Sequence, residues 1–162
     1  MDDLIWSLSP GVSFGLGDRG GTGRALSLSY SPSVMIYTKH DDFNGVNHSA
    51  NLRGSWPFSR LTLGVGQTYS LASGGVVDVG NRADVQSYAT SLTSHYEIDP
   101  LASFDINLSH SISEYDTPGL IGSSSWANDN WFNWEFTPRV TGGLGVGEGY
   151  MKRSEEHTSE LQ

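Results

Sequence analysis

The sequence has no cysteine, few charged residues and no long hydrophobic run, and these shortages narrow the class of protein. The absence of cysteine is compatible with an oxidising compartment. No apolar run approaches 18 residues, so no transmembrane helix is predicted. Charged residues make up only 17% of the chain, and there are five Trp, seven Tyr and six Phe, whereas a disordered chain has high charge and few aromatics. The net charge of −9, without a basic stripe, argues against nucleic-acid binding.

Both ends of the chain differ from what we expect of a native exported protein. Met1-Asp2-Asp3 has neither the positive segment nor the apolar segment of a secretory signal peptide, so we expect the natural chain to begin upstream. Residues 153–162, RSEEHTSELQ, are identical to the translation of a common sequencing-library adapter. We therefore predict that residues 1–152 are native, and that residues 153–162 are not and make no strand pairing.

What the chain has instead is regular alternation. Over residues 4–16, LIWSLSPGVSFGL, every second residue is apolar or proline, and those between are small apart from Ile5. Successive side chains of a strand point to opposite faces, so a period of two predicts a β-strand. Strands of soluble proteins usually have about 5–6 residues, whereas a tilted strand that crosses a membrane needs about 9–11. Alternating stretches of this greater length recur along the chain, which favours an outer-membrane β-barrel.

The alternation predicts an all-β fold, an antiparallel up-and-down meander of eight long strands. Their expected ranges are 3–17, 24–38, 47–57, 61–72, 83–98, 102–114, 127–137 and 140–150. Short connections, three of them at Pro57, Pro100 and Pro138, alternate with longer polar ones, as turns and outer loops do in such barrels. Pro10 and Pro32 fall inside predicted strands, where proline is unusual. Continuous bulged strands are expected there, and two extra hairpins are the alternative.

Five stretches of the chain carry a family resemblance. They are LSPGVSFGLGD (8–18), LSLSYSPS (26–33), FSRLTLGVGQTYS (58–70), VDVGNRADVQSYATSL (77–92) and NWFNWEFTPRVTGGLGVGEGY (130–150). In order and spacing they resemble the beta-barrel porin-2 family of bacterial outer-membrane proteins, although each is a strand pattern rather than a chemical signature. The resemblance implies a location in the outer membrane of a Gram-negative bacterium. It also implies that this chain is an internal fragment of a longer transmembrane barrel.

The two phases of the strands predict two sets of site residues. Aromatic residues fall on the apolar phase, several near strand ends, where a girdle at the lipid headgroups would lie. The predicted lipid-facing girdle comprises Trp6, Tyr30, Trp56, Tyr69, Tyr88, Tyr96, Phe104, Phe132, Trp134 and Phe136. The opposite phase is mainly Ser, Thr, Gly and Asn. The residues predicted to face the lumen are Arg53, His95, Glu97, Asp105, Asn107 and Glu135. In a pore their charges would bias ion passage; in the alternative they form ion pairs that hold the wall.

No catalytic chemistry is predicted. Serine and histidine are both present, but the chain has no Gly-x-Ser-x-Gly elbow. Asp41-Asp42 and the run Asn128-Asp129-Asn130 lack the spacing of a calcium loop, and we read them as solvated loop residues. We therefore expect neither enzyme activity nor a cofactor or metal. The expected partner is the lipid bilayer of the outer membrane.

A porin or channel for hydrophilic solutes is the favoured function. A lumen wall of Ser, Gly, Thr and Asn offers neutral hydrogen bonds but no apolar pocket that would capture one ligand. Three alternatives stay open. The chain could belong to an exopolysaccharide-export channel that works with cell-envelope machinery. It could form a small closed eight-stranded barrel with a structural or adhesive role. It could also form a soluble ligand-binding barrel whose apolar face turns inward.

Overall fold

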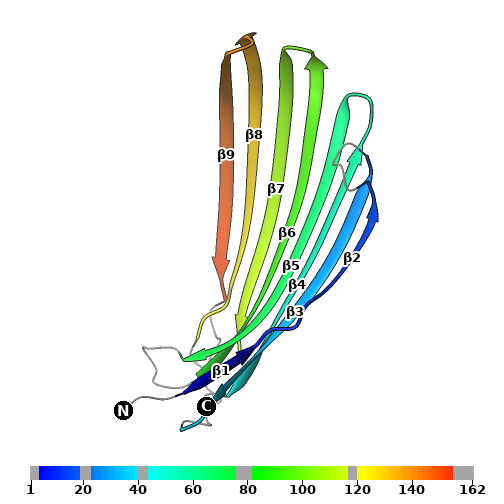
Figure 1. Cartoon of the computed structure of the whole chain (residues 1–162). Coiled ribbons are helices and arrows are strands. Elements are labelled where there is room, and N and C mark those ends of the chain that lie inside the picture. The colour runs from blue at the N-terminus through cyan, green and yellow to red at the C-terminus, as the bar shows by residue number, and fades with distance from the viewer. Residues whose placement is uncertain (1–3, 19–22, 40–43, 76–81, 117–119, 155–162) are drawn as a thin grey trace, which may run out of the picture.

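The computed structural model describes residues 4–18, 23–39, 44–75, 82–116 and 120–154, which form one antiparallel β-sheet (Figure 1). The strands are β1 (Ile5–Leu8), β2 (Val12–Gly17), β3 (Ala25–Tyr37), β4 (Gly45–Pro57), β5 (Leu61–Gly75), β6 (Arg82–Asp99), β7 (Ala102–Tyr115), β8 (Ser123–Thr137) and β9 (Val140–Arg153). From β3 onward each strand pairs with the next one along the chain. The predicted all-β antiparallel meander is therefore confirmed. A search of the described residues for a helix able to cross a membrane finds none.

The hairpins turn at the three predicted prolines, Pro57, Pro100 and Pro138. Proline presets φ for a turn and cannot donate to a ladder, so it is well placed where a strand ends. At the first of these turns the Phe58 amide donates to the Leu61 carbonyl at 2.7 Å. The ladders beside the other two turns each contain a register shift close to the turn. Such a shift inserts an extra residue and increases the local twist of the strand.

The described residues form nine strands rather than the predicted eight, because the first predicted strand is interrupted at Pro10. β1 and β2 both pair with β3, and the register is the same on the two sides of the interruption. β3 continues through Pro32 without a register shift. The predicted bulges are therefore wrong, and so are the alternative hairpins. The interruption is local because a proline removes one donor from the ladder and leaves the direction of the strand unchanged.

Several strands are longer than predicted, and the last one enters the segment read as non-native. β8 begins at Ser123 rather than at residue 127, and β9 runs to Arg153, which pairs with Ser123. The amide of Ser154 also donates to the Gly122 carbonyl at 2.9 Å. The prediction that residues 153–162 make no strand pairing is thus wrong at Arg153, because the extended β8 still offers Ser123 as a partner there. Residues 155–162 lie outside the described residues.

The hairpin ends are staggered across the sheet, as the turns that step down from β8–β9 toward β2–β3 show (Figure 1). The last pair of residues before each turn can be related to a position on β7 through the register. For the hairpins β2–β3, β4–β5 and β6–β7, this closing pair is level with Asn107, Asp105 and Ala102 of β7, respectively. The closing pair of the hairpin β8–β9 lies three residues further toward the turns, since Ala102 pairs with Trp134 and this hairpin closes at Thr137. Each hairpin is therefore displaced in the same direction relative to the one before it.

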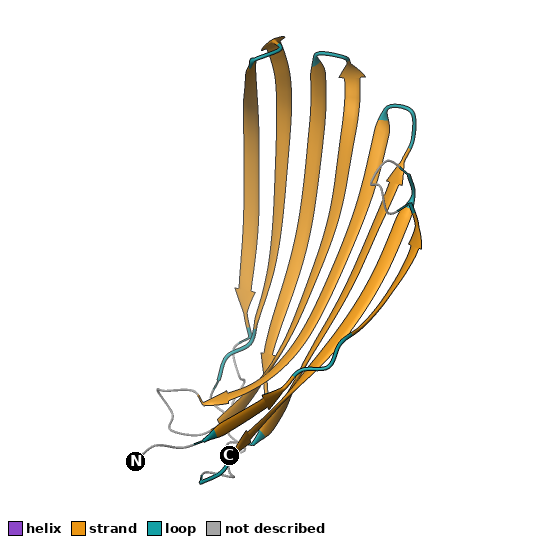
Figure 2. Cartoon of the chain, in the orientation of Figure 1, coloured by secondary structure: helices purple, strands orange, loops and turns teal. Residues whose placement is uncertain are grey.

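The sheet is a single open layer, as Figure 2 shows. β1 and β2 form one edge and β9 forms the other, and no pairing between these edges occurs in the described part of the chain. Closure into a barrel is thus not observed and stays a prediction. Ala102 is the only buried apolar residue among those described. The sheet has no core of its own, so what covers its apolar side chains must come from outside this layer.

Candidate functional site

The register assigns every strand residue to one of two faces, because paired residues share a face and successive residues alternate. One row of paired residues, from β3 to β9, is Ser27, Arg53, Gly66, Ser91, Ser109, Ala127 and Gly149. We call the face that contains this row the polar face. The neighbouring row is Leu26, Gly54, Val65, Leu92, Leu108, Asn128 and Glu148. We call the face that contains it the apolar face.

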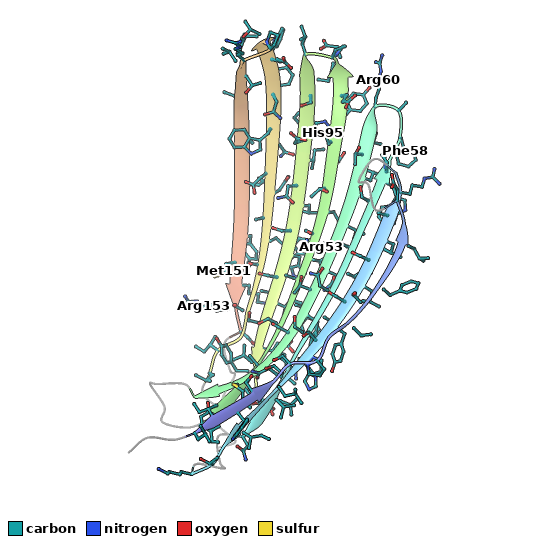
Figure 3. The ribbon with its side chains drawn as sticks, in the orientation of Figure 1. Arg53, Phe58, Arg60, His95, Met151 and Arg153 are labelled. Atoms are coloured by element: carbon teal, nitrogen blue, oxygen red, sulfur yellow. The ribbon has the colours of Figure 1, made fainter. Side chains whose placement is uncertain are left out.

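The six residues predicted to face a lumen all lie on the polar face. They come from four strands: Arg53 from β4, His95 and Glu97 from β6, Asp105 and Asn107 from β7, and Glu135 from β8. Arg53 and His95 are labelled in Figure 3, which shows the small side chains that surround them along the strands. The register thus gathers these residues on one surface. That this surface lines a lumen stays a prediction.

A hydrogen-bonded cluster of three side chains lies on the polar face, near the end of the sheet that carries the turns at Pro100 and Pro138. His95 and Asp105 are directly opposite on β6 and β7, and His95 Nδ1 lies 2.5 Å from Asp105 Oδ1. Asn133 of β8 donates from Nδ2 to Asp105 Oδ2 at 2.6 Å. Both carboxylate oxygens therefore have a partner, which holds this charge in place on the sheet. The side chains of His95 and Asp105 remain 45% and 38% exposed, so water and small solutes can reach them.

Two further residues of the polar face were not predicted there. Asp129, read from the sequence as a solvated loop residue, lies within β8 opposite Asn107. The alternation of β8 held the signal, because Asp129 has the same phase as Asn133. Trp131 shares this phase as well, and its ring covers Gly145 of β9: a Cβ built on Gly145 would lie 2.6 Å from two of the ring carbons. The polar face therefore carries one more acid, and an indole, than the sequence reading assigned to it.

Arg53 stands apart from these acids. β5 and β6 separate it from Asp105, and it forms no ion pair with another described residue. The surface around it is a shallow depression of about 520 Å³, lined mainly by small residues such as Gly64, Gly66 and Ser91. A second depression of about 330 Å³ includes His95, Glu97 and Glu135. Charge on this face is thus divided between Arg53 on β4, the acidic residues of β6–β8 and Arg153 at the end of β9.

The ten predicted girdle residues all lie on the apolar face. Their strands are β1 for Trp6, β3 for Tyr30, β4 for Trp56, β5 for Tyr69, β6 for Tyr88 and Tyr96, β7 for Phe104, and β8 for Phe132, Trp134 and Phe136. Several rings touch across or along strands. The centroids of Tyr69 and Tyr88 are 5.1 Å apart, and Trp134 stacks with Phe136 at 6.3 Å. That lipid contacts these rings stays a prediction.

The apolar side chains of this face are largely exposed. Examples in the middle of their strands are Leu28, Leu92 and Ile106, which are 48%, 49% and 40% exposed. Large contiguous apolar surfaces are rare on soluble monomers and mark contact with a membrane or a partner. The described residues therefore present one polar face and one exposed apolar face.

The histidine, serine and acidic groups of the sequence are only partly among the described residues. His40, Asp41 and Asp42 lie outside the described residues. Across the described ranges, no three acidic, histidine or cysteine side chains are placed to hold a metal ion. His110 does meet a serine, with Nε2 3.0 Å from Ser124 Oγ, but on the apolar face and stacked on Trp126. A comparison of the sequence with models of protein families finds no match, and a comparison with curated protein sequences finds none either.

Proposed function

We propose that this chain forms part of the wall of a bacterial outer-membrane β-barrel that works as a porin or channel for hydrophilic solutes. The observation that carries the proposal is a single sheet of long strands with an uncovered apolar face and no core. Removing apolar surface from water is worth about 25 cal/mol per Å², so this face needs a cover. Lipid supplies that cover while leaving the other face to water.

The spacing of aromatic residues supports a membrane-spanning band. On β6, Tyr88 and Tyr96 are eight residues apart, and on β8, Trp126 and Trp134 have the same separation. Eight strand residues extend about 27 Å, which is roughly 20 Å along the membrane normal for strands tilted by about 40°. The apolar band of outer-membrane barrels is about 25 Å tall and is flanked by aromatic girdles. The two pairs of rings therefore fit the two girdles.

The stagger of the hairpins supports a barrel. Between the hairpins β2–β3 and β8–β9, which lie six strands apart, the closing pairs differ by about eight residues. This is a displacement of roughly 26 Å along the strands over a distance of roughly 29 Å across the sheet. When the turns of a barrel lie at one level, such a stagger corresponds to strands tilted by about 40°, within the range of closed barrels. The resemblance to the beta-barrel porin-2 family points the same way.

The polar face suits passage of solutes rather than chemistry. Its residues are mainly small hydroxyl side chains and glycines. Among the described positions of β4–β8 that lie on this face, Arg53 is the only arginine or lysine, against the carboxylates Glu97, Asp105, Asp129 and Glu135. A wet lumen with this balance favours cations over anions. We accordingly assign the chain no enzymatic activity. The competing arrangement is a soluble barrel with the apolar face inside.

Neighbouring residues of β6 provide the test. Ser91 lies on the polar face and Leu92 on the apolar face, and the chain has no cysteine, so Ser91→Cys and Leu92→Cys each carry a single thiol. A spin label attached in outer-membrane vesicles should be reached by a water-soluble nickel relaxation agent at position 91 and by lipid-dissolved oxygen at position 92. A label at position 92 that neither agent reaches would contradict the membrane proposal and favour the soluble barrel.

A further inference from the structure

The apolar face is interrupted by a group of polar side chains on its last two strands. Asn128 and Asn130 of β8 and Glu148 of β9 lie together there, since Asn128 pairs with Glu148. We call these three residues the polar patch. On β8 the two asparagines lie between Trp126 and Trp134, the two rings that fit the girdles. The polar patch therefore lies at mid-height of the apolar band, where lipid would be least able to solvate it.

A second polar pair on the same face makes a useful contrast. Gln67 of β5 and Thr90 of β6 are opposite each other, and Thr90 Oγ1 donates to Gln67 Oε1 at 2.6 Å. These two side chains satisfy one another within the sheet. Polar groups paired in this way cost far less in an apolar environment than unpaired ones. Gln67 and Thr90 can therefore face lipid.

The polar patch is not satisfied in this way. Asn128 Oδ1 is buried and accepts no hydrogen bond. The side chains of Asn130 and Glu148 make no hydrogen bond or ion pair with another described residue. A carboxylate that faces lipid at this depth is destabilising, and an amide left without a hydrogen-bond partner in an apolar environment is destabilising as well. The patch is thus built for contact with something other than lipid.

We propose that the polar patch is the contact between two copies of this chain, which pack through β7–β9 around a two-fold axis in the membrane. The inference rests on the proposed function, because only a lipid surround makes the patch costly. Its chemistry is self-complementary, since an amide both donates and accepts hydrogen bonds. A two-fold interface needs this property, because each residue meets the same surface on its partner.

The charges around the patch fit the same geometry. Glu148 lies on β9, and His110 lies on β7, on the other side of β8. A two-fold rotation about an axis near Asn128 brings Glu148 of one copy to the side of the partner that carries His110. His110 is already held by its stacking on Trp126, with ring centroids 4.0 Å apart. The acid of each copy thereby gains a partner that the described part of its own sheet does not provide.

Apolar residues around the patch supply the rest of the contact. Leu144, Val146 and Tyr150 of β9 are 80%, 71% and 65% exposed on the same face. Tyrosine and tryptophan are enriched among the residues that contribute most to binding at protein interfaces. With Trp126 they surround the polar patch, so the surface combines a polar centre with an apolar surround.

Disulfide trapping tests the proposal, because the chain has no cysteine of its own. Asn128→Cys places one thiol near the axis, where two Cα atoms can approach to the 4.4–6.8 Å that a disulfide requires. Oxidation in outer-membrane vesicles should give a covalent species of twice the mass, and the yield should persist when the protein is diluted tenfold with lipid. Leu92→Cys is the matched control. It occupies the same register row, two strands away, and should give at least fivefold less of this species.

A second variant tests the chemistry of the contact. In an Asn130→Cys background, Asn128→Leu removes the central amide while keeping similar volume, and should lower the trapped yield at least fivefold. If Asn128→Cys gives no trapped species although a label at Leu92→Cys is reached by lipid-dissolved oxygen, the contact between copies is refuted while the membrane proposal stands. If the label at Leu92→Cys is not in lipid, the proposed function itself fails.

Discussion

Pro10 and Pro32 lie opposite each other on neighbouring strands. Leu8 pairs with Val34, and Val12 pairs with Tyr30, so equal steps along the two strands bring the prolines face to face. Neither has an amide hydrogen, and the ladder therefore has a gap at this point. Side chains bridge the gap instead. Ser9 Oγ donates to Ser33 Oγ at 2.9 Å, and Ser31 Oγ donates to the Pro10 carbonyl at 3.2 Å.

The serine bridge beside the prolines should contribute measurable stability. We expect Ser33→Ala to lower the free energy of unfolding by about 0.5–1.5 kcal/mol, the net worth of one hydrogen bond. Ser9→Ala added to Ser33→Ala should cost little more, because one bond joins the two hydroxyls. Urea unfolding in lipid vesicles measures all four proteins of this double-mutant cycle. Strictly additive losses would show that the two hydroxyls do not interact.

The indole of Trp131 should make Gly145 intolerant of any side chain. A Cβ at Gly145 would lie 2.6 Å from ring carbons of Trp131, so Gly145→Ala should destabilise the sheet by about 1–3 kcal/mol through overpacking. Gly149→Ala is the matched control on the same strand and face. There the nearest atom is the Trp126 carbonyl oxygen at 3.4 Å, and the change should be neutral. Equal effects of both substitutions in urea unfolding would contradict this role of Trp131.

A charge placed on each face of β6 should have very different costs. Leu92 lies midway between Tyr88 and Tyr96 on the apolar face, so Leu92→Arg should cost about 2–4 kcal/mol, as for an arginine at the bilayer midplane. Ser91→Arg projects from the polar face over Gly66 and should change stability by no more than about 0.5 kcal/mol. Folding into vesicles at increasing urea measures both. A larger loss for Ser91→Arg would reverse our assignment of the two faces.

The charges of the polar face should set ion preference. In planar bilayers under a salt gradient, we expect a reversal potential that favours cations. Asp105→Asn should move it toward zero, and Arg53→Gln should increase the preference for cations. Both effects should shrink in 1 M salt, where the screening length is about 3 Å. An anion preference of the unmodified protein, or identical potentials for all three, would exclude these charges as the cause.

The strands, the turns and the division of residues between faces could be read from the sequence because each depends on neighbouring residues only. Side chains alternate along any strand, so Leu92 and Ser91 must face opposite ways wherever the strand pairs. The turn at Pro57 was likewise predictable, since proline restricts its own φ and removes its own donor. Asp129 also follows the alternation of its strand, although its position between two asparagines is typical of a loop.

What only the tertiary structure decided is the register between strands. The hydrogen bonds of His95 and Asn133 to Asp105, the meeting of Pro10 with Pro32 and the pairing of Asn128 with Glu148 all depend on it. Register is set by turn geometry and by register shifts such as those near Pro100 and Pro138. A change of one residue in a turn moves every later pair while leaving the local pattern of alternation intact. The sequence alone therefore determined which residues share a face, and the folded sheet decided which of them touch.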